Sequence, residues 1–154
     1  MTLHDLQQLL FQYRDTAYAD FSARLIPTVP RERMIGIRTP EYKNIIGQIR
    51  DDPVVPVFLA SLPHKWHEEN CLHAALINRI RDYDACVSAL EQFMPYIDNW
   101  AVNDMVNPAC FRKHRGELCP GLGSPVPLIR DIREKADGRV DSRNGAVANA
   151  QGIW

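Results

Sequence analysis

The sequence predicts an all-α protein, an α-solenoid of HEAT-like antiparallel helix pairs. Apolar residues recur at helical spacing up to about residue 115, and no convincing alternation of apolar and polar residues indicates a strand there. Capping residues and prolines divide this stretch into short pieces. Short helices joined by two to five residues must lie antiparallel to their neighbours, so a stack of helices follows.

Three of the expected helices open with a capping residue and a proline suited to the first helical position: Thr39-Pro40, Asp52-Pro53 and Asn107-Pro108. Asp82 or Asp84 can cap the helix that runs to Phe93, and Asp98 is the expected cap of the helix after it. The expected helices cover residues 3–14, 17–25, 40–50, 53–62, 64–81, 82–93, 98–106 and 108–116.

The composition is that of a soluble globular domain. A chain of 154 residues with 45% hydrophobic and 24% charged residues can bury a core, which excludes a disordered chain. No apolar run approaches the roughly 18 residues of a membrane-spanning helix, and the N-terminus lacks the layout of a signal peptide. We therefore expect a cytoplasmic protein. Its four cysteines form no CxxC motif and are expected to be reduced (Cys71, Cys86, Cys110, Cys119).

The chain divides at about residue 118. Residues 1–118 are the expected helical repeat domain, and residues 119–154 form an atypical tail rich in proline, glycine and small residues, with one plausible helix over 126–137. The tail has too few apolar residues at regular spacing to specify a packed structure.

Two basic clusters stand out on a chain whose net charge is only −1. The first contains five cations and two acids between positions 31 and 50, and the second follows position 111 (Arg31, Arg33, Arg38, Lys43 and Arg50; Arg112, Lys113, His114 and Arg115). Basic side chains gathered on one face can bind phosphates, and they are equally common as solvated surface. We take Arg38, Lys43, Arg112 and Lys113 as candidate residues for binding the phosphates of a nucleic acid.

The segment His67-Glu68-Glu69-Asn70-Cys71 resembles the start of an HExxH zinc motif, but Cys71 stands where the second histidine is required. We therefore expect no metal site, with Glu68 and Glu69 on the polar face of their helix and His73 in the interior. The sequence also contains no GxGxxG motif, phosphate-binding loop or nucleophile elbow. No cofactor is expected.

Trp100 and Asp104 are four residues apart and share one face of their expected helix. Spacing alone favours a core tryptophan and an aspartate in a local ion pair. The sequence around this pair changes the interpretation. Three stretches closely resemble the DNA alkylation repair family, the AlkD-like glycosylases, and they are residues 34–43, 62–70 and 95–106. Tyr18-Ala-Asp-Phe and the residues 25–29 are similar to the opening of that family, so the resemblance covers residues 1 to about 118.

The resemblance implies a solenoid of HEAT-like repeats whose basic concave surface holds duplex DNA. It implies an enzyme that removes positively charged N3- and N7-alkylated purines, with Trp100 and Asp104 as catalytic residues and Arg38 as a DNA contact. AlkD-like enzymes are known for acting on the lesion while it stays stacked. The partner expected is thus duplex DNA that contains alkylated bases, bound by a monomer.

The tail departs from the family, whose members continue with further helical repeats. We expect that residues from about 119 onward derive from a frameshift or truncation, which the other two reading frames beyond codon 118 would reveal, and that excision by this chain is impaired. Two alternatives stay open. A non-catalytic DNA-binding module would bind duplex with salt dependence but release no base. A protein-interaction scaffold would show no affinity for DNA.

Overall fold

The computed structural model describes residues 1–113, and these contain helices and no strand. In chain order the elements are α1 (Leu3–Gln12), α2 (Thr16–Leu25), η1 (Arg31–Arg33), α3 (Glu41–Ile49), α4 (Val54–Ala60), α5 (His67–Ile77), α6 (Tyr83–Phe93), η2 (Met94–Tyr96), α7 (Trp100–Met105) and α8 (Cys110–Lys113). The predicted all-α fold class is therefore confirmed. The expected helix over 126–137 and the tail after residue 118 lie outside the described residues.

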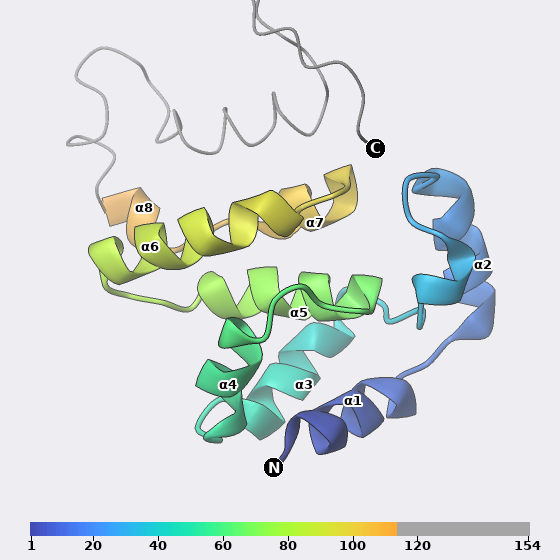
Figure 1. Ribbon diagram of the computed structural model, residues 1–154, viewed down its shortest axis with the longest axis horizontal. Helices are drawn as coiled ribbons and strands as arrows, with labels where there is room; N and C mark the ends of the chain where they lie inside the picture. Colours follow the sequence, from blue (N-terminus) through green and yellow to red (C-terminus); the bar gives the residue numbers. More distant parts are fainter. Residues whose placement is uncertain (114–154) are drawn as a thin grey trace, which may run out of the picture.

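Helix α5 lies at the centre of the stack (Figure 1). It contacts α3 on one side and α6 and α7 on the other, and α5 and α6 run antiparallel to each other. Helix α1 packs on α4, while α8 packs on α6. Successive helices that pack on their neighbours in this way are what an all-α helical repeat fold requires.

The main core surrounds α5, and it is built from apolar side chains of every α-helix except α2 (among them Leu10, Ile45, Phe58, Leu72, Ile77, Leu90, Phe93, Val102 and Phe111). A second, smaller cluster lies between α2 and α7. It contains Ala19, Ile26, Val29 and Met34, and Ala101 of α7 packs against it. The apolar contact between helix α2 and the rest of the molecule is therefore small.

Two of the predicted capping residues bind an amide at the start of their helix. The side chain of Asp52 accepts from the backbone N–H of Val54 at 2.8 Å, and that of Asp82 accepts from Ala85 at 2.8 Å. Two expectations are wrong. Thr39 does not cap α3, which begins at Glu41 without a side-chain cap, and the cap of α7 is Asn99 rather than Asp98, because the Asn99 Oδ1 accepts from Val102 at 3.0 Å.

The expected polar face of α5 is also wrong. Glu68 and Glu69 are both buried, and each carboxylate accepts two hydrogen bonds from backbone N–H groups. Glu68 accepts from Ile35 and Gly36 at 2.8 and 2.7 Å, whereas Glu69 accepts from Lys65 and Trp66 at 3.0 and 2.9 Å. By engaging these two amides, Glu69 also makes the helix begin at His67 instead of position 64. Buried carboxylates with backbone donors are satisfied polar groups.

Gly36 makes the contact between Glu68 and residues 35–36 possible. Its φ is +90°, and a Cβ at this position would lie 2.1 Å from the carbonyl oxygen of Asp15 and 2.8 Å from the Cβ of Ala19. Only glycine adopts this backbone conformation without strain and also leaves room for the start of α2. The residue therefore holds the segment before Arg38 against both α2 and α5.

Other predictions about the interior are confirmed. His73 is buried, and its Nδ1 lies 2.8 Å from the Nε2 of His64. Cys71, Cys86 and Cys110 are free thiols, whereas Cys119 lies outside the described residues. Within residues 1–113, no helix has the length and apolar character needed to cross a bilayer.

Candidate functional site

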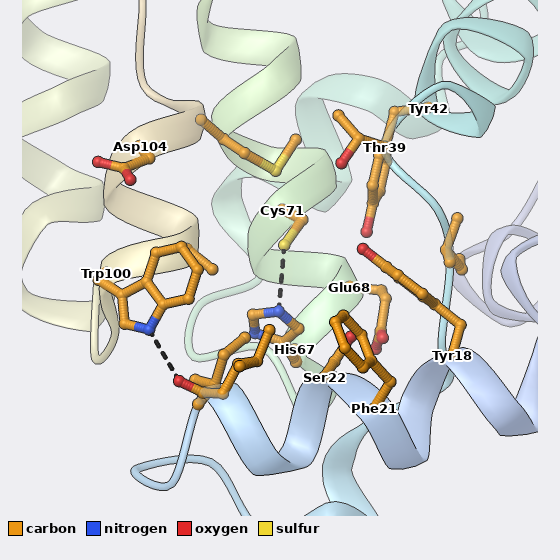
Figure 2. A pocket seen from close by; sticks show the side chains of 15 residues that line it. Tyr18, Phe21, Ser22, Thr39, Tyr42, His67, Glu68, Cys71, Trp100 and Asp104 are labelled. Atoms are coloured by element: carbon orange, nitrogen blue, oxygen red, sulfur yellow. Dashed lines mark hydrogen bonds between the residues drawn. The ribbon is translucent and has the colours of Figure 1, made fainter.

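A cavity of about 340 Å³ opens between α2 and α7, with α5 behind it (Figure 2). Helix α2 contributes Tyr18, Phe21, Ser22 and Leu25, and α7 contributes Trp100, Ala101, Asp104 and Met105. The remaining lining residues come from the segments between α2 and α5 and from α5 itself (Ile26, Ile37, Thr39, Tyr42, His67, Glu68, Cys71). The structure thus brings both predicted catalytic residues, Trp100 and Asp104, to one cavity.

The cavity has an exposed rim and a buried floor. At the rim, Trp100 is 47% exposed, Phe21 is 55% exposed and Leu25 is 49% exposed. At the floor, Tyr42 and Glu68 are no more than 4% exposed. A molecule that enters past the rim therefore leaves bulk water and meets fixed groups on α5 and α3.

Spacing alone favoured a core position for Trp100, and this is wrong because the side chain is half-exposed. Its indole Nε1 donates to the backbone carbonyl of Leu25 at 3.1 Å, across the gap between α7 and α2. This hydrogen bond satisfies the polar end of the ring and orients its face along the cavity wall (Figure 2). A half-exposed aromatic ring held in this way is available to contact a ligand.

Asp104 lies one helical turn after Trp100 on the same side of α7, and its side chain is exposed. Within residues 1–113, no hydrogen bond or ion pair engages its carboxylate, so the local ion pair favoured by spacing alone is absent. A carboxylate that is exposed and engaged by none of the described side chains is available to a positive charge that enters the cavity.

A hydrogen-bonded chain connects α5 to the start of α7. Asn99 uses its Oδ1 to cap α7, so its Nδ2 is the group that faces the Nδ1 of His67 at 3.4 Å. His67 then carries its proton on Nε2, which lies 3.6 Å from the Sγ of Cys71. Burial lowers the pKa of His67 even though the Glu68 carboxylate opposes this shift. The histidine is therefore neutral, and it fixes the helix that carries Trp100 and Asp104.

The charge of the cavity lining is negative. Glu68 and Asp104 contribute two carboxylates, and no lysine or arginine is among the lining residues that the structure describes. Burial raises the pKa of the Cys71 thiol, so this floor residue is a neutral thiol rather than a thiolate nucleophile. A site with this lining favours cations and repels phosphate groups.

Among the described side chains, Arg38 is the one predicted DNA-binding residue that lies beside the cavity. The guanidinium of Arg38 lies 4.8 Å from the centre of the Tyr18 ring, and it donates to the Asp15 carboxylate at 2.9 and 3.1 Å. These hydrogen bonds contribute to the lowered pKa of Asp15, after the larger effect of the Tyr18 backbone N–H. Because Arg38 remains exposed, it can contact a phosphate outside the rim while Tyr18 faces the cavity.

The described part of the structure places none of the other predicted DNA-binding residues at the cavity. Lys43 is exposed on α3, directly after the buried Tyr42, and it is not part of the cavity lining. Arg112 and Lys113 belong to α8, and their side chains lie outside the described part of the structure. No group of three or more potential metal ligands occurs within residues 1–113.

Sequence reasoning missed most of the cavity. Phe21, Tyr42, His67, Glu68 and Cys71 carry no motif that marks them, and three of them come from a segment interpreted only as a failed zinc motif. One feature of the sequence could have indicated the floor of the cavity, namely the concentration of polar residues in the first turn of α5. A buried central helix with such a start must direct these groups to specific partners.

Comparisons with known proteins confirm the resemblance. A family model described as DNA alkylation repair enzyme matches residues 6–118, which is most of the chain. No curated protein and no solved structure matches the chain.

Proposed function

Because the chain belongs to the DNA alkylation repair enzyme family and so has a role in DNA repair, we propose that it is a glycosylase for positively charged N3- and N7-alkylated purines in duplex DNA. The observation that carries the proposal is the joint exposure of Trp100 and Asp104 in a cavity whose described lining contains no positively charged side chain. This arrangement suits a reaction in which positive charge is present at the start and moves during bond cleavage.

The chemistry needs charge stabilisation more than proton transfer. An alkylated purine already carries a positive charge, so its glycosidic bond breaks without a general acid, and positive charge grows on the sugar. The Asp104 carboxylate would stabilise that charge. At about 4 Å and an effective dielectric constant near 20, the attraction is roughly 4 kcal/mol, which corresponds to about a thousandfold in rate if it is realised only in the transition state.

Trp100 would assist through the face of its indole ring. Cation–π attraction to the sugar or the lesion contributes about 0.5–2 kcal/mol, and the hydrogen bond to Leu25 removes the need to reorient the ring during the reaction. Asp104 would also orient the attacking water or accept its proton. This mechanism requires neither the buried thiol of Cys71 nor the neutral imidazole of His67.

Arg38 would hold the DNA next to the cavity. The two carboxylates of the lining repel phosphates, so the backbone must be bound outside the rim, and Arg38 lies there beside Tyr18. Its pairing with Asp15 keeps the guanidinium extended but also weakens its attraction for phosphate. We therefore expect a modest contribution of this residue to duplex affinity.

The direct test is to incubate the full chain with N-methylated duplex DNA and to measure released free bases by chromatography. The proposal predicts release of 7-methylguanine and 3-methyladenine above the spontaneous rate, and no release from unmodified duplex. Salt-dependent binding without release would indicate a non-catalytic DNA-binding module instead. Absence of any affinity for duplex would favour a protein-interaction scaffold.

A further inference from the structure

We propose that Asn78, the residue that directly follows α5, is a positioning residue for excision. Its side chain fixes the C-terminal end of α7 and thereby places Asp104 in the cavity, although Asn78 is not itself among the lining residues that the structure describes. The inference rests on the proposed function, since it concerns the same reaction and adds a residue that acts on it through Asp104.

Helix α7 is too short to hold its own position. It has six residues, whereas isolated helices shorter than about 12–15 residues are marginal in water. Val102 packs into the main core, but apolar burial has no preferred direction and leaves the rotation of a short helix poorly fixed. The orientation of α7 must therefore come from directional contacts, which are hydrogen bonds.

Asn78 supplies such contacts at the end of α7. Its Nδ2 donates to the backbone carbonyl of Met105 at 2.6 Å, and its Oδ1 accepts from the backbone N–H of Asn107 at 2.7 Å. The backbone carbonyl of Asn78 also accepts from the N–H of Ala109 at 3.4 Å. Because α7 ends at Met105, the carbonyl of this residue has no partner within the helix. Asn78 therefore fixes the segment that leaves α7 at three points.

The side-chain amide of Asn78 matches the two backbone groups that it joins. A carbonyl only accepts a hydrogen bond and an N–H only donates one, so a bridge between Met105 and Asn107 needs a side chain that carries both a donor and an acceptor. Aspartate at this position would lose the donor, and alanine would lose both groups. The identity of residue 78 therefore decides whether the end of α7 is held.

Helix α5 holds α7 at both ends. His67, the first residue of α5, faces the Nδ2 of Asn99, which caps the start of α7. Asn78, at the other end of α5, binds the last residue of α7. The two helices thus lie start to start and end to end, and the buried α5 sets the position of the helix that carries the proposed catalytic pair.

Trp100 and Asp104 depend on this anchor to different degrees. The indole of Trp100 has its own hydrogen bond, to the carbonyl of Leu25 on α2. Within residues 1–113, no hydrogen bond or ion pair engages the Asp104 carboxylate, so the backbone alone positions it. The group that Asn78 binds is the carbonyl of the next residue, Met105. Loss of the Asn78 side chain should therefore displace Asp104 more than Trp100.

The first experiment measures single-turnover excision from N-methylated duplex DNA by the full chain and its variants. Asn78→Ala should lower the rate constant at least about tenfold, because misplacement of a reacting group by about 1 Å is enough for a loss of this size. Duplex affinity should change less than about twofold, since the variant alters the reaction and not the binding of the substrate. The matched control is Asp82→Ala, which removes the hydrogen bond that caps α6 and should keep the parent rate.

Two results would overturn the inference and leave the glycosylase function standing. One is a parent-like rate constant in Asn78→Ala, and the other is an equal loss in Asp82→Ala, which would indicate general destabilisation. If Asn78→Ala does not fold, Asn78→Asp takes its place. This variant keeps the acceptor for Asn107 but loses the donor to Met105, so its rate constant should also fall at least about tenfold.

The second experiment does not depend on excision. Amide hydrogen exchange of the full chain, followed by NMR, should be at least about tenfold faster at Asp104 and Met105 in Asn78→Ala than in the parent, and unchanged there in Asp82→Ala. Unchanged exchange in Asn78→Ala would overturn the inference. Faster exchange in a chain whose parent releases no base would support the placement of Asp104 by Asn78 and contradict the proposed function.

Discussion

Helices α5 and α2 face the same cavity, but they are held in place very differently. All residues of α5 except Ala75 are buried, although the helix begins with four polar residues in a row. Helix α2 has a single buried residue, Ala19, and exposes the large apolar side chains of Phe21 and Leu25. The helix whose first turn is more polar is therefore the one that lies in the interior.

The difference shows how each wall of the cavity is stabilised. On α5, the buried carboxylates of Glu68 and Glu69 are matched to specific backbone donors, so their positions are fixed by geometry as well as by packing. On α2, a small apolar cluster and the hydrogen bond from Trp100 to Leu25 supply the contacts with α7. We infer a fixed floor and a rim that can adjust to a ligand.

The largest expected effect is on the floor. Glu68→Ala leaves the buried amides of Ile35 and Gly36 without an acceptor, at a cost of roughly 2 kcal/mol each, so we expect a loss of about 4 kcal/mol in the free energy of unfolding. Urea denaturation followed by circular dichroism measures it. If this variant does not fold, Glu68→Gln, which keeps one acceptor, should give an intermediate loss.

The control is Glu91→Ala on α6, where the side chain is exposed and the change should stay within about 0.5 kcal/mol. A loss of equal size at both positions would contradict the view that the Glu68 carboxylate anchors residues 35–36.

An intermediate effect concerns the buried histidine pair behind the floor. His64 stacks on Phe58 with ring centres 4.3 Å apart, and His73 stacks on Phe93 at 4.1 Å. Burial lowers the pKa of His73 to about 3 and lowers that of His64 as well. The unfolded chain thus binds protons near pH 6.5 that the native state does not, and stability present above that pH is lost as the pH falls.

We expect His73 alone to reduce the free energy of unfolding by about 2 kcal/mol between pH 7 and pH 5. Denaturation at both values measures this difference. The matched control combines His64→Gln with His73→Asn, which keeps polar atoms near the two bonded nitrogens but cannot titrate. A pH dependence that persists undiminished in the double variant would assign the effect to other groups.

The smallest expected effect is on the rim. Phe21→Ala removes an exposed ring from α2 and should change the free energy of unfolding by less than about 0.5 kcal/mol. Hydrogen exchange should show faster opening of the α2 amides than of the α5 amides, because few buried contacts hold α2. A loss of about 2 kcal/mol, or equal protection of both helices, would remove the distinction between floor and rim.

The helices could be predicted from the sequence because their signals are local. Asp52 and Asp82 cap helices through amides two and three residues away, so the pattern contains both partners. The cap of α7 was harder, since Asp98 and Asn99 are both good capping residues. Asn99 takes this position while its amide nitrogen faces His67, a residue 32 positions away that no local pattern identifies.

The cavity could be predicted only in part. Trp100 and Asp104 lie one turn apart, and the family resemblance supplied a reason to place them at a site. Glu68 was assigned to a polar face because a charged residue is seldom buried. Its partners, Ile35 and Gly36, come from a turn that forms only because Gly36 adopts a positive φ beside Asp15. Such a partnership is a property of the folded chain.

The central claim is that the carboxylate of Asp104 stabilises positive charge during excision, and the most direct measurement compares Asp104→Asn with the parent chain on N-methylated duplex DNA. The variant keeps the shape of the side chain but loses its charge. The account predicts that release of 7-methylguanine falls by about a thousandfold while duplex affinity is unchanged, with Asp84→Asn on α6 as the control that retains full activity. Equal rates of release by Asp104→Asn and the parent would contradict it.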